Sequence, residues 1–201
     1  MNDASGAERA RLPSAIPAAQ REAVPGSLIT RRLTASDVEV FRTFRMEAVS
    51  DSPSSFLKNR EETAATPLTD FAAGFDGPSD SAVFGTFVDD QLIAVIGLRQ
   101  EAFAKRRHLA TIWGVYTTPM HRRRGLSRAL LQQVLQRAID SADILALLLH
   151  VNPENLSAKS LYRSFGFNTI GHQPMSLCID GIFVAEQLMM LSLPTKIDRR
   201  D

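Results

Sequence analysis

The sequence predicts an α/β fold in which one mixed sheet packs against helices. Short apolar segments of strand length recur along the chain, and two segments repeat their apolar residues with the period of a helix. In the C-terminal half the two kinds of segment alternate, which is typical of mixed α/β sheets. The 201 residues, of which 44% are hydrophobic and 22% charged, suffice for one domain with a core that needs no disulfide or metal.

The N-terminal half is predicted to hold a tail, a strand, helical segments and a hairpin. Residues 1–26 contain three prolines and no hydrophobic period, so we expect a disordered tail ahead of a domain at 27–194. A strand is expected at Leu28–Leu33, and Thr34–Asp37 supply capping groups for the helix that follows. The next predicted elements are an irregular segment at 55–67, a loop at 74–80, and hairpin strands at 82–88 and 92–98.

The C-terminal half alternates strands with helices. A long amphipathic helix follows Gly125, and a short helix at Asn155–Phe165 ends at Gly166. The segment Ile144–Val151 is apolar almost throughout, which is typical of a strand covered on both faces. Strands are predicted at 109–117, 144–151, 171–179 and 184–193, followed by a charged tail at 195–201.

Charge and cysteine content exclude classes of function rather than select one. The net charge of +1 gives no overall attraction to nucleic acid or to membrane surfaces. Cys178 is the only cysteine, and its apolar neighbours predict a buried small hydrophobic residue rather than a nucleophile. No apolar run reaches the ~20 residues of a membrane helix, and residues 1–25 lack the apolar core of a secretory signal. We therefore expect a cytoplasmic protein, and no metal site is indicated.

The most informative segment is a basic turn between a strand and the long helix. Unpaired N–H groups and the helix dipole make the N-terminus of a helix an anion site, and Gly125 lets a phosphate approach the backbone. The arginines gathered at this turn are Arg122, Arg123, Arg124 and Arg128. A solvated basic turn is the alternative, and neither the Walker nor the G-x-G-x-x-G pattern is present. A second basic cluster at 105–107 lies at the other end of the strand, which argues against one nucleic-acid patch.

Two blocks of residues resemble the GNAT superfamily of acyl-CoA N-acyltransferases. The first is Arg122-x-x-Gly125-x-Ser127, similar to the family's [QR]-x-x-G-x-[GA]. The second runs Asn155-x-x-Ala158-x-x-Leu161-Tyr162-x-x-x-Gly166-Phe167. The resemblance implies a mostly antiparallel, twisted sheet of six to seven strands flanked by about four helices, in which two neighbouring strands splay apart around acetyl-CoA.

The resemblance also implies roles for individual residues. Backbone groups of Val115, Tyr116 and Thr117 would hold the pantetheine arm and the thioester. Pyrophosphate would be bound at the turn, by Arg122, Arg123, Arg124, Gly125, Leu126, Ser127 and Arg128. Asn155 and Tyr162 would contact the cofactor farther along, and Ser127 departs from the usual glycine or alanine by one small hydroxyl.

The implied activity is N-acetylation of a primary amine by direct attack on the thioester. Tyr162 would protonate the leaving thiolate, unless it is an ordinary residue of an amphipathic helix. His150 stands where some relatives place a glutamate base; a histidine hydrogen-bonded within the sheet, or a water chain as base, are the alternatives.

The acceptor amine, on a small molecule or a protein, is expected to be recognised by the first helices, the Phe56 region, the 74–80 loop and the last hairpin. Trp113 and Tyr116 are candidates for lining its pocket, with a core position as the alternative for Trp113. A sensor that binds acyl-CoA without turnover is the alternative function. A homodimer through the last strands is compatible with the pattern.

Overall fold

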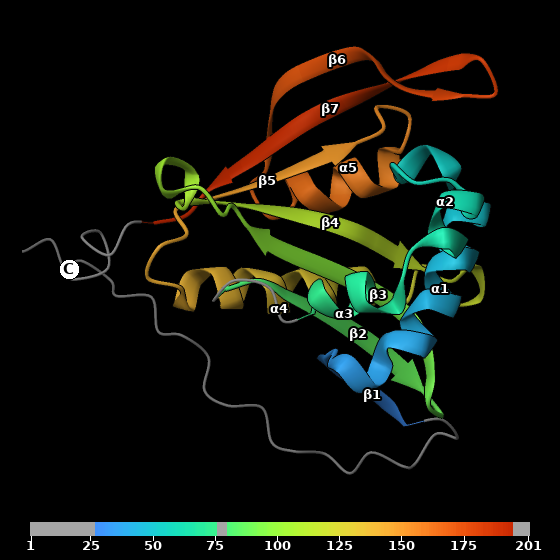
Figure 1. Ribbon diagram of the computed structural model, residues 1–201. Helices are drawn as coiled ribbons and strands as arrows, with labels where there is room; N and C mark the ends of the chain where they lie inside the picture. Colours follow the sequence, from blue (N-terminus) through green and yellow to red (C-terminus); the bar gives the residue numbers. More distant parts are fainter. Residues whose placement is uncertain (1–26, 76–79, 195–201) are drawn as a thin grey trace, which may run out of the picture.

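The computed structural model describes residues 27–75 and 80–194, which form a seven-stranded sheet flanked by helices (Figure 1). The strand order is β1-β2-β3-β4-β5-β7-β6, and all neighbours are antiparallel except β4 and β5. The bounds are β1 Leu28–Arg32, β2 Ala82–Val88, β3 Gln91–Gln100, β4 Leu109–Thr117, β5 Ala146–Val151, β6 Asn168–Ile179 and β7 Ile182–Ser192. The expected mixed, mostly antiparallel sheet is confirmed. The tails predicted at 1–26 and 195–201, and residues 76–79 of the predicted loop, lie outside the described residues.

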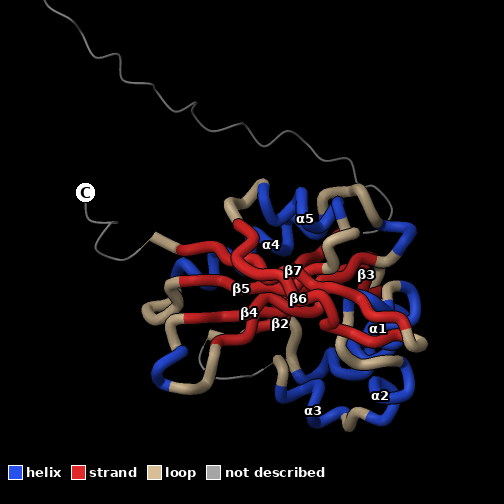
Figure 2. Tube along the Cα trace, turned by 90° about the horizontal axis from the view of Figure 1, so that it is seen from above, coloured by secondary structure: helices blue, strands red, loops and turns tan. Residues whose placement is uncertain are grey.

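The helices form two layers, one on each face of the sheet (Figure 2). The described part contains α1 Val38–Asp51, α2 Arg60–Ala65, α3 Leu68–Ala73, α4 Leu126–Asp140 and α5 Leu156–Arg163. On one face, α1 buries Phe41 and Phe44 against β2, β3 and β4. On the other face, α4 buries Leu130, Leu131 and Val134. The irregular segment predicted at 55–67 contains the short helix α2, and α3 follows it, so the described part has five α-helices where about four were expected. None of them is long and apolar enough to cross a membrane.

The capping groups predicted at Thr34–Asp37 cap a 3-10 turn at Ala35–Asp37, through which the chain enters α1. The backbone N–H of Thr34 donates to Asp37 Oδ2 at 2.8 Å, and Arg31 donates to both oxygens of that carboxylate at 2.6 and 2.7 Å. The hydrogen bond from Arg31 contributes most to lowering the pKa of Asp37 to about 2. These contacts fix the direction in which the chain leaves β1.

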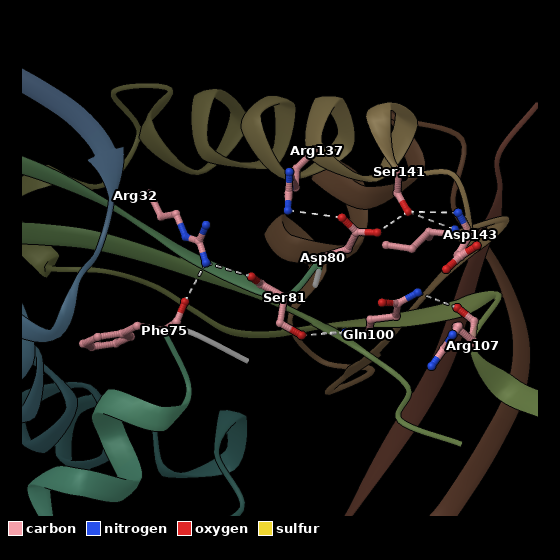
Figure 3. Close-up of polar contacts among 10 residues, drawn as sticks. Arg32, Phe75, Asp80, Ser81, Gln100, Arg107, Arg137, Ser141 and Asp143 are labelled. Carbon is pink, nitrogen blue, oxygen red and sulfur yellow. Dashed lines mark hydrogen bonds and ion pairs between the residues drawn. The ribbon is translucent and has the colours of Figure 1, made fainter. Parts of the chain in front are cut away.

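The start of β2 is anchored on two sides (Figure 3). Arg32 Nη2 donates to the backbone carbonyls of Phe75 at 2.9 Å and Ser81 at 3.2 Å. Asp80 forms an ion pair with Arg137 of α4 at 3.1 Å and accepts a hydrogen bond from Ser141 Oγ at 2.5 Å. The contacts therefore hold β1, β2 and the C-terminal end of α4 together.

Strand β5 is covered on both faces only at its start, where Ala146 and Leu147 are buried, so the expectation of two covered faces for Ile144–Val151 fails at the end of the strand. Leu147 and Leu149 are buried under α4, whereas His150 is exposed on the opposite face. The apolar cluster under α1 includes residues of β2, β3 and β4 but none of β5. Because that helical layer stops at β4, the His150 face of β5 stays open.

The last two strands form a long hairpin whose outer strand, β6, is an edge of the sheet. Its pairing with β7 is broken by two register shifts into short runs at 168–169, 171–173 and 177–179. Cys178 lies near the tip and is exposed, so its predicted burial is wrong. Phe183, its partner across the hairpin, is 57% exposed. Neither apolar cluster includes residues of the tip, although the tip faces the end of α1 and the segment that follows it.

Candidate active site

The parallel pair of strands opens into a cleft. Strands β4 and β5 are paired only from Leu109↔Ala146 to Thr111↔Leu148, after which they diverge (Figure 1). A cleft of about 670 Å³ lies beyond this point, lined by both strands, the start of α4, α5 and Glu186 of β7. The separation of neighbouring strands that the resemblance implies is present here.

A bulge in β4 turns the strand at the cleft. Between the pairs Gly97↔Trp113 and Val95↔Tyr116, β4 contains one residue more than β3. Gly114 sits in the bulge with φ +63°, a left-handed conformation that glycine adopts without a Cβ penalty. The next three residues all line the cleft: Val115, Tyr116 and Thr117.

The basic turn after β4 has the geometry of an anion site. Gly125, with φ +80°, is the N-cap of α4, and no described atom lies within 4 Å of the place that a Cβ would take there. The first i to i−4 hydrogen bond of α4 runs from the Ala129 N–H to the carbonyl of the N-cap, Gly125, at 3.0 Å. The N–H groups of 126–128 come before this bond and have no partner within the helix, as at any helix N-terminus. Thr117 Oγ1 and Ser127 Oγ, 3.1 Å apart, link the end of the strand to the start of the helix.

Arg122 is held by protein groups on the α1 side of the cleft. Its Nε donates to the Thr117 carbonyl at 3.0 Å, its Nη2 forms an ion pair with Asp51, and its guanidinium lies 5.5 Å from the centre of the Tyr116 ring. Partial burial would raise the pKa of Asp51, but hydrogen bonds from Arg122 and Ser52 outweigh it and lower that pKa. Arg122 therefore joins α1 to the end of β4.

The other three arginines lie at different places around the turn. Arg123, with φ +61°, and Arg128 both line the cleft. Arg128 Nη2 also donates to Ser164 Oγ at 2.8 Å, which connects α4 to the end of α5. Arg124 is exposed and does not line the cleft. The structure thus brings two of these three side chains to the cleft.

Helix α5 brings Asn155 and Tyr162 to the same cleft. Asn155 Oδ1 caps the helix by accepting the Ala158 N–H at 3.1 Å. Tyr162 is 5% exposed and packs against Phe167, with ring centres 5.9 Å apart. Burial raises the pKa of Tyr162. Its hydroxyl makes no hydrogen bond with the described residues, and Tyr162 lines the cleft.

His150 and Glu186 face the cleft from neighbouring strands. His150 is exposed on β5, and its ring forms no hydrogen bond within the described part, so the expected alternative of a sheet-bonded histidine is not found. Glu186 of β7 accepts a hydrogen bond from Ser176 Oγ at 2.6 Å. Our sequence reasoning missed Glu186, because only the register of β7 against β5 brings it to the cleft.

The wall opposite α5 carries aromatic side chains. Trp113 and Tyr116 line the cleft, and both also pack into the apolar cluster under α1, so each is at once a core and a cleft residue. Burial and the nearby Asp51 carboxylate raise the pKa of Tyr116. Ser52 and Ser55, which the sequence did not single out, line the same wall in the turn after α1.

Comparisons with known proteins agree with this geometry. The family model "Acetyltransferase (GNAT) family" matches residues 46–167. Streptothricin acetyltransferase of Escherichia coli is 29% identical over 102 residues, which are 51% of this chain and 55% of the relative. This chain thus spans about half the length of that curated relative.

Solved structures share the fold. An acetyltransferase of the GNAT family from Streptococcus pneumoniae matches with a TM-score of 0.69 at 20% identity, over 83% of this chain and 100% of its own. A Salmonella typhimurium protein solved with its cofactor acetyl-CoA matches with a TM-score of 0.68 at 16% identity, over 83% of this chain and 94% of its own. The family model spans more than half of the chain and includes both strands of the cleft, so the protein belongs to the GNAT acetyltransferase family.

Proposed function

We propose that the protein is an N-acetyltransferase that moves the acetyl group of acetyl-CoA to a primary amine by direct attack. The observation that carries the proposal is the cleft between β4 and β5, because the start of α4 and the buried Tyr162 both line it. Membership of the family supports acetyl transfer, and the acetyl-CoA in the Salmonella structure supports this co-substrate. We assign the activity to a domain at residues 27–194.

Acetyl-CoA would lie along the cleft from α4 to the β4 bulge. The N–H groups from Arg123 to Arg128 and the positive end of the α4 dipole suit a pyrophosphate. The open space at Gly125 lets phosphate oxygens reach the backbone. Backbone groups of 115–117 would hold the pantetheine arm and the thioester. Asn155 uses its oxygen to cap α5, which leaves its amide NH₂ to donate to that arm.

The reaction requires one proton to leave the amine and one to reach the sulfur. The amine nitrogen bonds to the thioester carbonyl carbon, the C–S bond breaks, and Tyr162 protonates the leaving thiolate. Because burial raises the pKa of Tyr162, its hydroxyl keeps its proton at neutral pH until the thiolate forms. His150 would accept the amine proton from the open face of β5, directly or through water. No covalent enzyme intermediate is needed, so the exposed Cys178 has no part in the reaction.

Calorimetry and a thiol-release assay test the proposal together. Acetyl-CoA should bind where ATP, used as a charged nucleotide control, binds far more weakly. Primary amines should then release free CoA, and Tyr162→Phe should reduce kcat by about 100-fold or more while acetyl-CoA affinity stays within about twofold.

Each outcome has a definite meaning. Binding of acetyl-CoA without thiol release from any amine would replace the enzyme by an acyl-CoA sensor. Equal binding of ATP and acetyl-CoA would contradict the proposal that the cleft is a site for acetyl-CoA. Unchanged turnover by Tyr162→Phe would remove this side chain as the acid and leave the transfer reaction standing.

A further inference from the structure

We propose that Arg45 binds an anionic group of the acceptor, so that the substrate is an amine that also carries a carboxylate, as a free amino acid does. The inference rests on the proposed acetyl transfer and adds the class of acceptor. It starts from an arginine of α1 that the sequence patterns do not distinguish.

The guanidinium of Arg45 lies between two aromatic rings beside the cleft wall. Its central carbon is 4.2 Å from the centre of the Phe56 ring and 5.9 Å from that of Trp113. A Cβ placed on Gly114 would lie 3.0 Å from Arg45 Nη1, so the glycine of the bulge makes room for this cation. Trp113 and Gly114 both line the cleft. Arg45 therefore contacts this wall of the cleft from the α1 side and is not itself one of the lining residues.

Arg45 has no anionic partner in the described part of the chain. Two comparable arginines are paired: Arg31 with Asp37, and Arg122 with Asp51. Arg45 forms no ion pair and no hydrogen bond with the described residues. Burial lowers its pKa to about 10, so the group is still charged at neutral pH. The Arg45 side chain is partly buried and its charge is unpaired, and the two ring contacts offset only part of the cost of that desolvation.

The position of Arg45 relative to the reaction explains why the anion belongs to the acceptor. Gly114 directly precedes 115–117, the backbone that we assign to the thioester. A carboxylate at Arg45 would thus place an α-amino group, two bonds from the carboxylate carbon, next to the acetyl group. Ser55, adjacent to the stacked Phe56, adds a hydroxyl on the same wall. The planar guanidinium suits a carboxylate, to which it donates two parallel hydrogen bonds.

The first experiment compares acceptors that differ in one charge. Thiol release is measured for each common L-amino acid and for its carboxamide. The acids should be preferred in kcat/KM by about 10- to 100-fold, the range of a charge-assisted hydrogen bond. Arg45→Gln should abolish the preference and Arg45→Lys should keep part of it. Arg99→Gln, which removes the same charge from an exposed position of β3 outside the cleft lining, should keep all of it.

A second experiment detects the anion without turnover. Trp113 is the only tryptophan of the chain and lies beside Arg45, so its fluorescence reports on that site. With saturating CoA, N-acetylglycine should change the emission saturably, whereas N-acetylglycinamide should not, and Arg45→Gln should remove the response.

Equal responses to acid and amide, no response to either, or an unchanged response in Arg45→Gln would overturn the proposal. If carboxamides alone are acetylated, the proposed acetyltransferase activity is supported and the proposed carboxylate site at Arg45 is wrong. If acetyl-CoA itself does not bind, the proposed function fails instead.

Discussion

Gly125 can be tested against a matched control, Gly181. Both residues have φ +80°, and at both no described atom lies within 4 Å of the place of a Cβ. Alanine at such a φ costs about 1–2 kcal/mol, of which about 0.4–1 kcal/mol is returned because the unfolded chain loses freedom. Gly125→Ala and Gly181→Ala should therefore each lower the free energy of unfolding by about 1 kcal/mol, as measured by urea unfolding.

Only the change at Gly125 should weaken acetyl-CoA binding. A methyl group there would stand where we propose that the pyrophosphate meets the backbone, and the loss of one charge-assisted hydrogen bond lowers affinity by about 10- to 100-fold. Gly125→Glu adds a carboxylate at about 5 Å from the pyrophosphate, and each pair of unit charges then repels by about 3 kcal/mol at an effective dielectric constant of about 20. Binding to Gly125→Glu should consequently be undetectable.

Titration calorimetry of both alanine variants decides the matter. The reasoning is refuted if Gly125→Ala binds acetyl-CoA within twofold of wild type, or if Gly181→Ala loses as much affinity. Equal destabilisation of the two variants is the internal check, because the backbone strain is the same at both positions.

Three further changes probe other parts of the molecule. Asp37→Asn should lower the free energy of unfolding by about 1–2 kcal/mol at pH 7, since the folded pKa of Asp37, about 2, lies below the unfolded value near 4. This stabilisation is present above pH 4 and is lost as the pH falls through 2. Urea unfolding at acidic pH should therefore show the stabilities of the two proteins converging. Gly97→Ala places a Cβ 2.3 Å from the Trp113 ring, which should cost about 1–3 kcal/mol and shift the tryptophan emission, whereas Gly171→Ala, with only ordinary contacts, should do neither. Asn155→Ala removes the cap of α5 and should lower the free energy of unfolding by about 1 kcal/mol. If calorimetry shows that the acetyl-CoA affinity of this variant is unchanged, Asn155 serves only to cap the helix.

Local patterns predicted those elements whose burial follows from their own period. Three residues of α4 that repeat at helical spacing are buried in the apolar cluster as expected: Leu130, Leu131 and Val134. The starts of α4 and α5 were also predictable, because Gly125 and Asn155 belong to short contiguous segments whose conformation depends on their own residues.

Features that depend on distant segments were not predictable in this way. Arg45 is an ordinary helix residue until α1 packs over the β4 bulge, and Glu186 reaches the cleft only through the register of β7. The burial expected for Cys178 failed for the same reason. An apolar neighbourhood in sequence predicts burial only where other elements pack closely on that face of the strand, and Cys178 lies outside both apolar clusters.

The two register shifts in β6 protect the exposed edge of the sheet against aggregation. An unbroken edge strand offers a row of free backbone groups to a second molecule, and cross-β assemblies need about six or seven continuous residues. The longest run of β6 in continuous register with β7 is only three residues, 171–173 or 177–179. Pro174 follows the first of these runs and has no N–H to donate. The hairpin can therefore expose apolar side chains at its tip without offering a continuous template for fibril growth.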